Sequence, residues 1–307
     1  MNPALSVVLF TTIAGAAQGL VVTLALAQLF GLPMGAGFVG MALLLAVAML
    51  LVGLGASSAH LGRPERAWRA VLMWRTSWLS REVIVLPLFI ASVALWWWAH
   101  RAGWASNLLP MLIIILAAAL WVCTAMIYAC LRFIQEWAQP LTLVNFALIG
   151  MSSGLVLVCA LAALNGERPL LQAAGPGALA FTVAAWATRM LALRHNARLQ
   201  PRSTLQSATG IKAARLVQTS MGMSAGSFNT REFFHGRTLA VLRQMKRAFI
   251  VLGFVAPALL VLVALLTAST SAWVLAAVVQ APGLLAERWF FFAQARHPQN
   301  LYYQVVS

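Results

Sequence analysis

The stretch AGFVGMALLLAVAMLLVGLGASS, residues 36–58, decides the fold of this chain. It contains no charged side chain and is long enough to cross a bilayer as a helix, since a transmembrane helix needs about 20 apolar residues. A basic segment, AHLGRPERAWRAVLMWRTSWLSRE at residues 59–82, follows directly. An apolar run that ends in clustered arginines is typical of a membrane span and its cytoplasmic boundary.

Similar apolar runs recur along the whole chain. Of the 307 residues, 62% are hydrophobic and only 9% are charged, which is typical of a polytopic membrane protein. The sequence therefore predicts an all-α membrane helix bundle, formed by a single domain over residues 1–307. We expect eight transmembrane helices, at residues 5–29, 36–58, 82–99, 108–129, 141–164, 171–193, 247–267 and 270–291.

The distribution of basic residues predicts the orientation of the bundle. Eight spans place both termini on one side, together with the connections 59–81, 130–140 and 194–246. That side carries 19 of the 21 Lys and Arg residues, and the opposite side carries only Arg101 and Arg168. Because basic residues are retained in cytoplasmic loops, we expect both termini to be cytoplasmic.

The composition disfavours several classes of protein. The net charge of +15 would suggest nucleic-acid binding in a soluble chain, but no such motif occurs and the basic residues lie between apolar spans. A membrane surface or an acidic partner explains the charge better. A transporter would need ionisable groups near mid-membrane. Gln18 is the strongest polar residue expected well inside a span, whereas Glu287 and Arg288 are expected to end the last helix.

The residue pattern predicts no metal site in this chain. The three cysteines have no CxxC spacing and lie in or beside apolar segments, so they favour neither zinc nor an iron-sulfur cluster. The five histidines lie at boundaries or in loops, which disfavours a bis-histidine haem inside the bundle. A single-ligand haem near the surface stays open on this reasoning.

The boundary segment contains the candidate chemistry. His60 ends the second expected helix and Glu82 begins the third, so both fall at the depth where a quinone headgroup would rest. Conversion of quinone to quinol takes two electrons and two protons. A histidine can hydrogen-bond a carbonyl oxygen, and a partly desolvated glutamate can relay protons. We expect a quinone site formed by His60, Glu82, Arg63, Arg66, Ser80 and Arg81.

Structural roles are the alternative for both central residues. Ser80 could cap the third helix, and Glu82 would then be a first-turn acid favoured by the helix dipole. His60 could bond free carbonyl groups at the end of the second helix. Spacing alone leaves these alternatives open.

The long connection 194–246 is the candidate docking loop. It is rich in Ser, Thr, Gly and basic residues and contains one carboxylate, Glu232, so it fits an acidic protein surface. Anionic lipid is the alternative, but it would not require the aromatic stretch SFNTREFFHG at residues 227–236. The expected partner-docking residues are Arg69, Arg75, Arg231, Phe233, Phe234, His235 and Arg237.

The boundary motif also resembles a known family. HLGRPERAW at residues 60–68, followed by SWLSRE at residues 77–82, is similar to the motif of the dimethyl sulfoxide reductase anchor subunits (DmsC-like), which are eight-helix membrane proteins. The resemblance covers the whole chain in length, helix count and motif position. It implies that His60 and Glu82 match the histidine and glutamate linked to quinol binding in that family.

The resemblance also implies cofactors and partners. A family anchor carries no haem and exchanges electrons between membrane quinone, either ubiquinone or menaquinone, and an iron-sulfur subunit. The iron-sulfur subunit in turn connects to a molybdopterin catalytic subunit, so the iron-sulfur clusters and molybdopterin belong to the partners.

The expected orientation departs from that of the reductase anchors, whose catalytic subunits are thought to lie outside. Three stretches look more like a cytoplasm-facing branch, the anchors of sulfite dehydrogenases (SoeC-like): IYACLRFIQEWAQPLT, SFNTREFFHG and AERWFFFAQARHPQNLYYQ. This resemblance implies a sulfite:quinone oxidoreductase of the bacterial inner membrane with its partners on the cytoplasmic side. A reductase-type anchor that oxidises quinol and a passive anchor without quinone chemistry are the alternatives.

Overall fold

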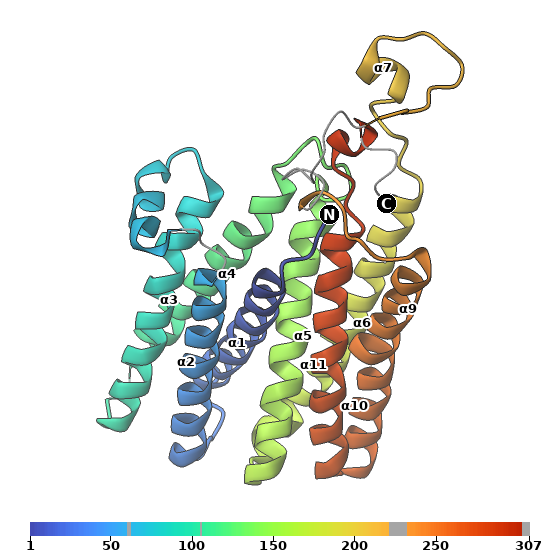
Figure 1. Cartoon of the computed structure of the whole chain (residues 1–307). Coiled ribbons are helices and arrows are strands. Elements are labelled where there is room, and N and C mark those ends of the chain that lie inside the picture. The colour runs from blue at the N-terminus through green and yellow to red at the C-terminus, as the bar shows by residue number, and fades with distance from the viewer. Residues whose placement is uncertain (60–62, 105, 221–231, 303–307) are drawn as a thin grey trace.

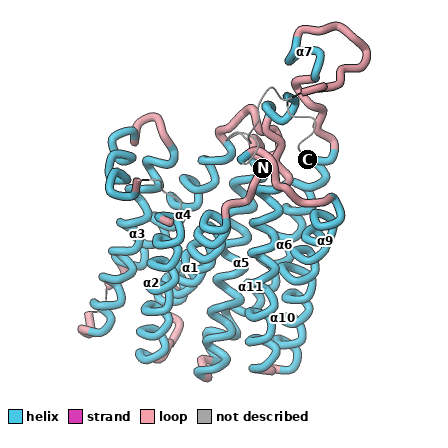
Figure 2. The backbone as a smooth tube through the Cα atoms, viewed as in Figure 1, coloured by secondary structure: helices cyan, strands magenta, loops and turns pink. Residues whose placement is uncertain are grey.

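The computed structural model of this chain describes residues 1–59, 63–104, 106–220 and 232–302. Within these ranges every regular element is helical, and the described chain contains no strand (Figure 2). The all-α prediction is therefore confirmed.

Within the described residues, eight segments are long and apolar enough to cross a membrane, which confirms the expected number of spans. Several short elements connect or follow these spans. The spans are α1 (Leu5–Leu29), α2 (Ala36–Ser58), α3 (Trp78–Arg101), α4 (Leu108–Ala129), α5 (Pro140–Asn165), α6 (Arg168–Ala197), the continuous run α9 (Leu239–Ile250), η2 (Val251–Val255) and α10 (Ala256–Thr267), and α11 (Thr270–Ala293). The short elements are η1 (Pro64–Met73), α7 (Leu205–Thr209) and η3 (Pro298–Tyr302).

α3 and α9 begin well before their hydropathy indicates, because a polar side chain caps each of them. α3 begins at Trp78, where the Oγ atom of Ser77 accepts a hydrogen bond of 3.3 Å from the Ser80 N–H group. α9 begins at Leu239, where the Oγ1 atom of Thr238 accepts one of 3.4 Å from Val241. Such N-caps satisfy amide groups that lack a partner inside the helix.

The connection between the sixth and seventh spans is therefore shorter than the expected range of residues 194–246. α6 extends to Ala197, and α9 supplies an amphipathic first part to the seventh span. Residues 198–238 lie between these helices, with α7 as a short described helix among them.

The spans form two neighbouring groups, with α1 and α5 in contact at the centre (Figure 1). α2, α3 and α4 lie on one side of this centre, and α6, α9, α10 and α11 lie on the other. η1, α7 and η3 all lie at the end of the bundle where α1 begins and α11 ends. This end therefore contains every short helix that lies in the described part of the chain.

Glycines allow α1 and α5 to approach closely. A Cβ atom on Gly154 would overlap the backbone of Gly19, and one on Gly19 would overlap the carbonyl group of Gly150. Small residues of this kind let membrane helices pack backbone to backbone. The close approach brings the polar residues of α1 next to those of α5.

Large apolar side chains are exposed on the outer faces of the helices. Leu51 on α2, Leu88 on α3 and Ile115 on α4 are each more than half exposed. A water-soluble monomer rarely exposes so much apolar surface, so these faces are suited to contact lipid.

Candidate functional site

Glu82 is buried between α3 and α4, and its side chain has a defined partner. The residue is 6% exposed, and its Oε1 atom accepts a hydrogen bond from the hydroxyl group of Thr124. Because Ser77 caps α3, Glu82 lies in the second turn of the helix and no acidic residue lies in the first. The helix dipole acts mainly on the terminal turn.

The alternative in which Ser80 caps the helix is therefore wrong. The side chain of Ser77 is the cap, and Ser80 supplies the amide group that is capped. Ser80 is itself buried within the first turn. Ser80 precedes Glu82 by two residues on α3, and both side chains are buried in the bundle.

His60 lies outside the described residues, so its approach to Glu82 stays a prediction. The described chain reaches Ala59, which caps the end of α2, and resumes at Arg63. α2 ends at the same end of the bundle where α3 begins (Figure 1).

Arg81 holds the connection between η1 and α3. Its Nε atom donates a hydrogen bond of 3.0 Å to the carbonyl group of Trp74, and Nη2 donates one of 2.9 Å to that of Arg75. Its guanidinium group also lies 4.1 Å from the ring centroid of Trp78. These contacts give Arg81 a structural role beside the one expected from the sequence.

The other arginines of the boundary segment are exposed. Arg63 and Arg66 lie on the surface, and among the described residues no hydrogen bond or ion pair joins them to buried Glu82. Arg69 and Arg75 are exposed too, each beside the ring of the preceding tryptophan. The structure does not bring these side chains to the Glu82 carboxylate.

The surface of η1 combines these arginines with large apolar side chains. Trp68 is 63% exposed, and Leu72, Met73 and Trp74 are each more than half exposed. Arginine and tryptophan side chains together favour the boundary between lipid and water. η1 is therefore suited to lie along the membrane surface next to the start of α3.

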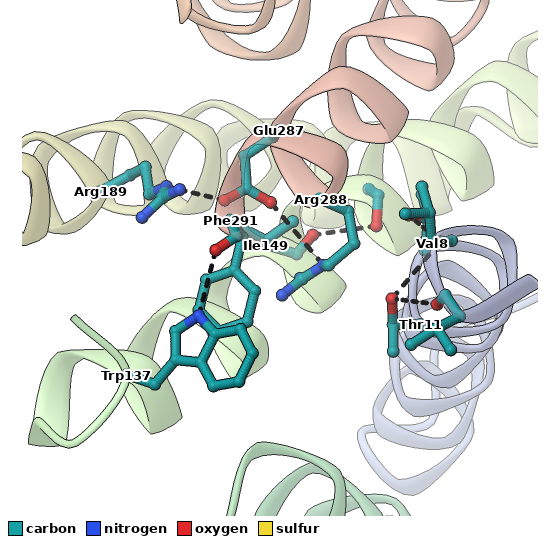
Figure 3. A network of polar contacts seen from close by, with 11 residues as sticks. Val8, Thr11, Trp137, Ile149, Arg189, Glu287, Arg288 and Phe291 are labelled. Carbon is teal, nitrogen blue, oxygen red and sulfur yellow. Dashed lines mark hydrogen bonds and ion pairs between the residues drawn. The ribbon is translucent and has the colours of Figure 1, made fainter. Parts of the chain in front are cut away.

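A second charged cluster lies inside the bundle, where the apolar pattern of the sequence does not predict one. Arg189 on α6 forms an ion pair of 2.7 Å with the Oε1 atom of Glu287 on α11, and Oε2 lies 3.8 Å from the Nε atom of Arg288 (Figure 3). All three side chains are buried. Figure 3 shows Glu287 between the two arginines, and we call these three residues the buried triad.

The buried triad corrects two expectations. Gln18 is not the strongest polar residue inside a span, and Glu287 and Arg288 do not end the last helix, because α11 continues to Ala293 through the buried residues Phe290, Phe291 and Phe292. One sequence signal was present: Arg189 interrupts the apolar run AAWATRMLAL at residues 184–193. A charge inside such a run is expected to have a partner.

Aromatic rings surround the cations of the buried triad. The guanidinium group of Arg288 lies 3.8 Å from the ring centroid of Phe146, and that of Arg189 lies 5.6 Å from the centroid of Phe249. The quadrupole of an aromatic ring attracts a cation placed over its face. The rings thus offset part of the cost of burying two cations beside one carboxylate.

A narrow cavity of about 20 Å³ lies between α1, α4, α5 and α11. Its polar lining includes Thr124, the partner of Glu82, and Arg288 of the buried triad, together with Gln18 and Trp121. The Oε1 atom of Gln18 and the Nε1 atom of Trp121 have no hydrogen-bond partner in the described part of the chain. A small polar space therefore lies between Thr124, the partner of Glu82, and Arg288 of the buried triad.

The described docking residues pack against the end of the chain. The Phe233 ring stacks on His297 with 3.8 Å between the ring centroids, and Asn300 donates a hydrogen bond of 3.0 Å to the Phe233 carbonyl group. Burial lowers the pKa of His235, whose Nδ1 atom accepts a hydrogen bond of 3.1 Å from the Arg237 N–H group.

The expected docking residues therefore fall into two places. Phe233 stacks on His297, which follows α11, and Phe234, His235 and Arg237 follow Phe233 along the chain. Arg69 lies on η1 and Arg75 follows it, and η1 is at the opposite edge of the same end of the bundle (Figure 1). Arg231 lies outside the described residues.

Two comparisons with known proteins agree over the length of the chain. A family model described as the DMSO reductase anchor subunit (DmsC) matches residues 1–292. A sulfite dehydrogenase subunit of Allochromatium vinosum is 47% identical over 326 aligned residues, which cover 100% of both chains.

Proposed function

Since this chain belongs to the DMSO reductase anchor subunit family, we propose that it is the quinone-reactive anchor of a sulfite dehydrogenase complex. The family gives the general role of the chain: it is a multi-pass membrane anchor subunit of a sulfite dehydrogenase or DMSO reductase-type complex. The full-length similarity to a sulfite dehydrogenase subunit supports the choice of sulfite.

The buried carboxyl group of Glu82 is the observation that carries the quinone proposal. A carboxyl group inside a membrane span is costly to bury, and such groups commonly mark proton or substrate pathways. Glu82 lies one turn inside α3 and has the Thr124 hydroxyl group as a hydrogen-bond donor. In this position it can pass protons to a quinone at the membrane boundary.

The proposed reaction takes electrons from a partner iron-sulfur subunit, which receives them from a molybdopterin subunit that oxidises sulfite. The quinone gains two electrons and two protons and leaves as quinol. In this scheme His60 hydrogen-bonds a quinone oxygen and Glu82 supplies protons. Arg63, Arg66, Ser80 and Arg81 shape the boundary around them, and this chain holds no redox cofactor of its own.

We place the anchor in the bacterial inner membrane with both termini in the cytoplasm. The charge distribution supports this orientation, because 19 of 21 basic residues fall on the side of the termini. η1, α7 and η3 lie at that same end of the bundle (Figure 1). The partner subunits then dock from the cytoplasm, and the connection between α6 and α9 contributes to their docking surface.

The test compares two activities of the intact complex purified with this anchor. Sulfite-driven reduction of a short-chain quinone analogue requires the anchor, whereas reduction of an artificial dye requires only the partner subunits. His60→Ala is expected to abolish the first activity and preserve the second, with all subunits still assembled. Normal quinone reduction in this variant would remove His60 from the quinone site, and quinol oxidation coupled to DMSO reduction would favour the reductase-type alternative.

A further inference from the structure

The cavity beside Thr124 has the size and chemistry of a site for one water molecule. A water molecule needs about 10–15 Å³ of such space and usually makes about three hydrogen bonds. The cavity offers about 20 Å³, which is far too little for a quinone ring. Gln18 and Arg288, both 3% exposed, line it from α1 and α11.

The polar atoms around the cavity match the hydrogen-bonding capacity of water. The indole N–H of Trp121 is a donor without a hydrogen-bond partner in the described residues. Arg288 lines the cavity as a cation, and its Nε atom faces Glu287 at 3.8 Å. The Oε1 atom of Gln18 is an acceptor without one. The Thr124 hydroxyl group donates its proton to Glu82, so its oxygen is free to accept a further bond. One donor and two acceptors match the roughly three hydrogen bonds that a buried water molecule usually makes.

The packing of α5 against α4 makes this arrangement possible. A Cβ atom at position 150 would lie 2.6 Å from the Nε1 atom of Trp121, so only glycine leaves room for the indole ring there. Gly150 itself lines the cavity together with Gly15. The polar space is therefore formed by close helix packing.

We propose that this cavity binds one water molecule and that Thr124 relays protons between that water and Glu82. The inference rests on the proposed quinone function and adds the path by which Glu82 is reprotonated. Thr124 is a positioning and relay residue, because it acts on quinone only through Glu82.

The proton balance of the relay is simple. Glu82 gives its proton to an oxygen of the reduced quinone and becomes a carboxylate. The Thr124 hydroxyl group then gives its proton to Glu82 and takes one from the cavity water, which recovers a proton from bulk water. One O–H bond breaks and one forms at each step, and the electrons come only from the partner subunits.

The test uses Thr124→Val in the intact complex, because valine keeps the shape of threonine and lacks the hydroxyl group. We expect sulfite-driven quinone turnover to fall by about 10-fold to 100-fold, which is at or below the lower end of the usual effect of acid–base catalysis. Dye activity and the KM for the quinone analogue should stay unchanged. The solvent deuterium isotope effect on turnover should rise, and Thr124→Ser should restore the rate.

Two further variants complete the experiment. Thr23→Val is the matched control, since Thr23 is a buried threonine on α1 whose hydroxyl group donates a hydrogen bond of 2.8 Å to the carbonyl group of Gly19 on the same helix. It should turn over at the wild-type rate. Gln18→Leu removes one acceptor of the cavity and should slow turnover in the same direction as Thr124→Val.

The outcomes separate the relay from the proposed function. If Glu82→Gln slows quinone turnover and Thr124→Val does not, the relay is wrong and the quinone function stands. If neither variant changes turnover, the role of Glu82 in the proposed function fails as well. Equal slowing in Thr124→Val and Thr23→Val, without a change in the isotope effect, would assign Thr124 a packing role and overturn the relay.

Discussion

The Nε atom of Arg189 lies 2.7 Å from the Oε1 atom of Glu287, and both side chains are only 2% exposed. This ion pair joins α6 to α11 inside the bundle (Figure 3). A charged residue in a membrane interior requires such a partner, because water is not present to solvate it. The pair therefore fixes how these two helices face each other.

We predict that Glu287→Ala destabilises the anchor strongly. Removal of one partner from a buried pair leaves an uncompensated charge, which typically costs about 3–5 kcal/mol. The measurement is thermal unfolding of the detergent-solubilised complex. Glu65→Ala is the control, because Glu65 is exposed on η1 and should leave the melting temperature unchanged. Equal melting temperatures for the wild type and Glu287→Ala would contradict a stabilising pair.

Replacement of Glu82 by Gln should slow quinone turnover more than it weakens quinone binding. Glutamine keeps the shape of the side chain and can still accept a hydrogen bond from Thr124, but it does not transfer protons. Steady-state kinetics with a quinone analogue should therefore show a kcat at least about 10-fold lower with a nearly constant KM. A parallel loss of assembly, dye activity and quinone turnover would indicate that Glu82 serves stability instead.

The orientation can be tested with reporter proteins. Gly210 lies on an exposed connection after α7, at the same end of the bundle as η1 (Figure 1). A reporter that is active only in the cytoplasm should be active when inserted at Gly210 or fused after Ser307, because the basic residues retain this side inside. Activity of a periplasm-specific reporter at these positions would reverse the orientation and remove the support for sulfite oxidation in the cytoplasm.

The contact between Phe233 and His297 should depend on pH. Burial lowers the pKa of His297 below its ordinary value of 6.5. The folded state therefore binds fewer protons than the unfolded state, so the contribution of this contact is present above about pH 6.5 and declines as the pH falls below that value. The protection of residues 232–237 against hydrogen exchange, which compares the measured rate with the intrinsic rate at the same pH, should fall at acidic pH in the wild type.

His297→Phe is the control for this pH dependence. The substitution keeps a ring that can stack on Phe233 and removes the titrating group. Exchange of residues 232–237 should then respond to pH only through the intrinsic chemistry of the amide groups. The same loss of protection at acidic pH in both proteins would exclude His297 as its cause.

The sequence by itself determined the eight spans and the candidate boundary. Hydropathy is a local property, because a membrane helix satisfies its own backbone hydrogen bonds and needs only about 20 apolar residues. The residues at which α3 and α9 begin were less predictable. Their first turns contain polar residues, and the caps at Ser77 and Thr238 extend both helices beyond the apolar windows.

Only the tertiary structure decided how the polar residues meet. Near a helix end, Glu287 and Arg288 could equally reach the membrane surface along flexible side chains. The packing of α11 against α5 and α9 instead buries both residues, and α6 supplies Arg189 as the partner. The rotation of each helix about its axis fixes such contacts, and that rotation depends on helices far apart in the chain.

The cavity beside Thr124 depends on tertiary packing in the same way. Its lining comes from four helices, and the close contact of α1 with α5 at Gly19 and Gly154 sets their separation. Glu82 was identifiable from its place in the sequence, because it follows a basic boundary segment. Its hydrogen bond with Thr124 was not, because no local pattern specifies which residue of α4 faces α3.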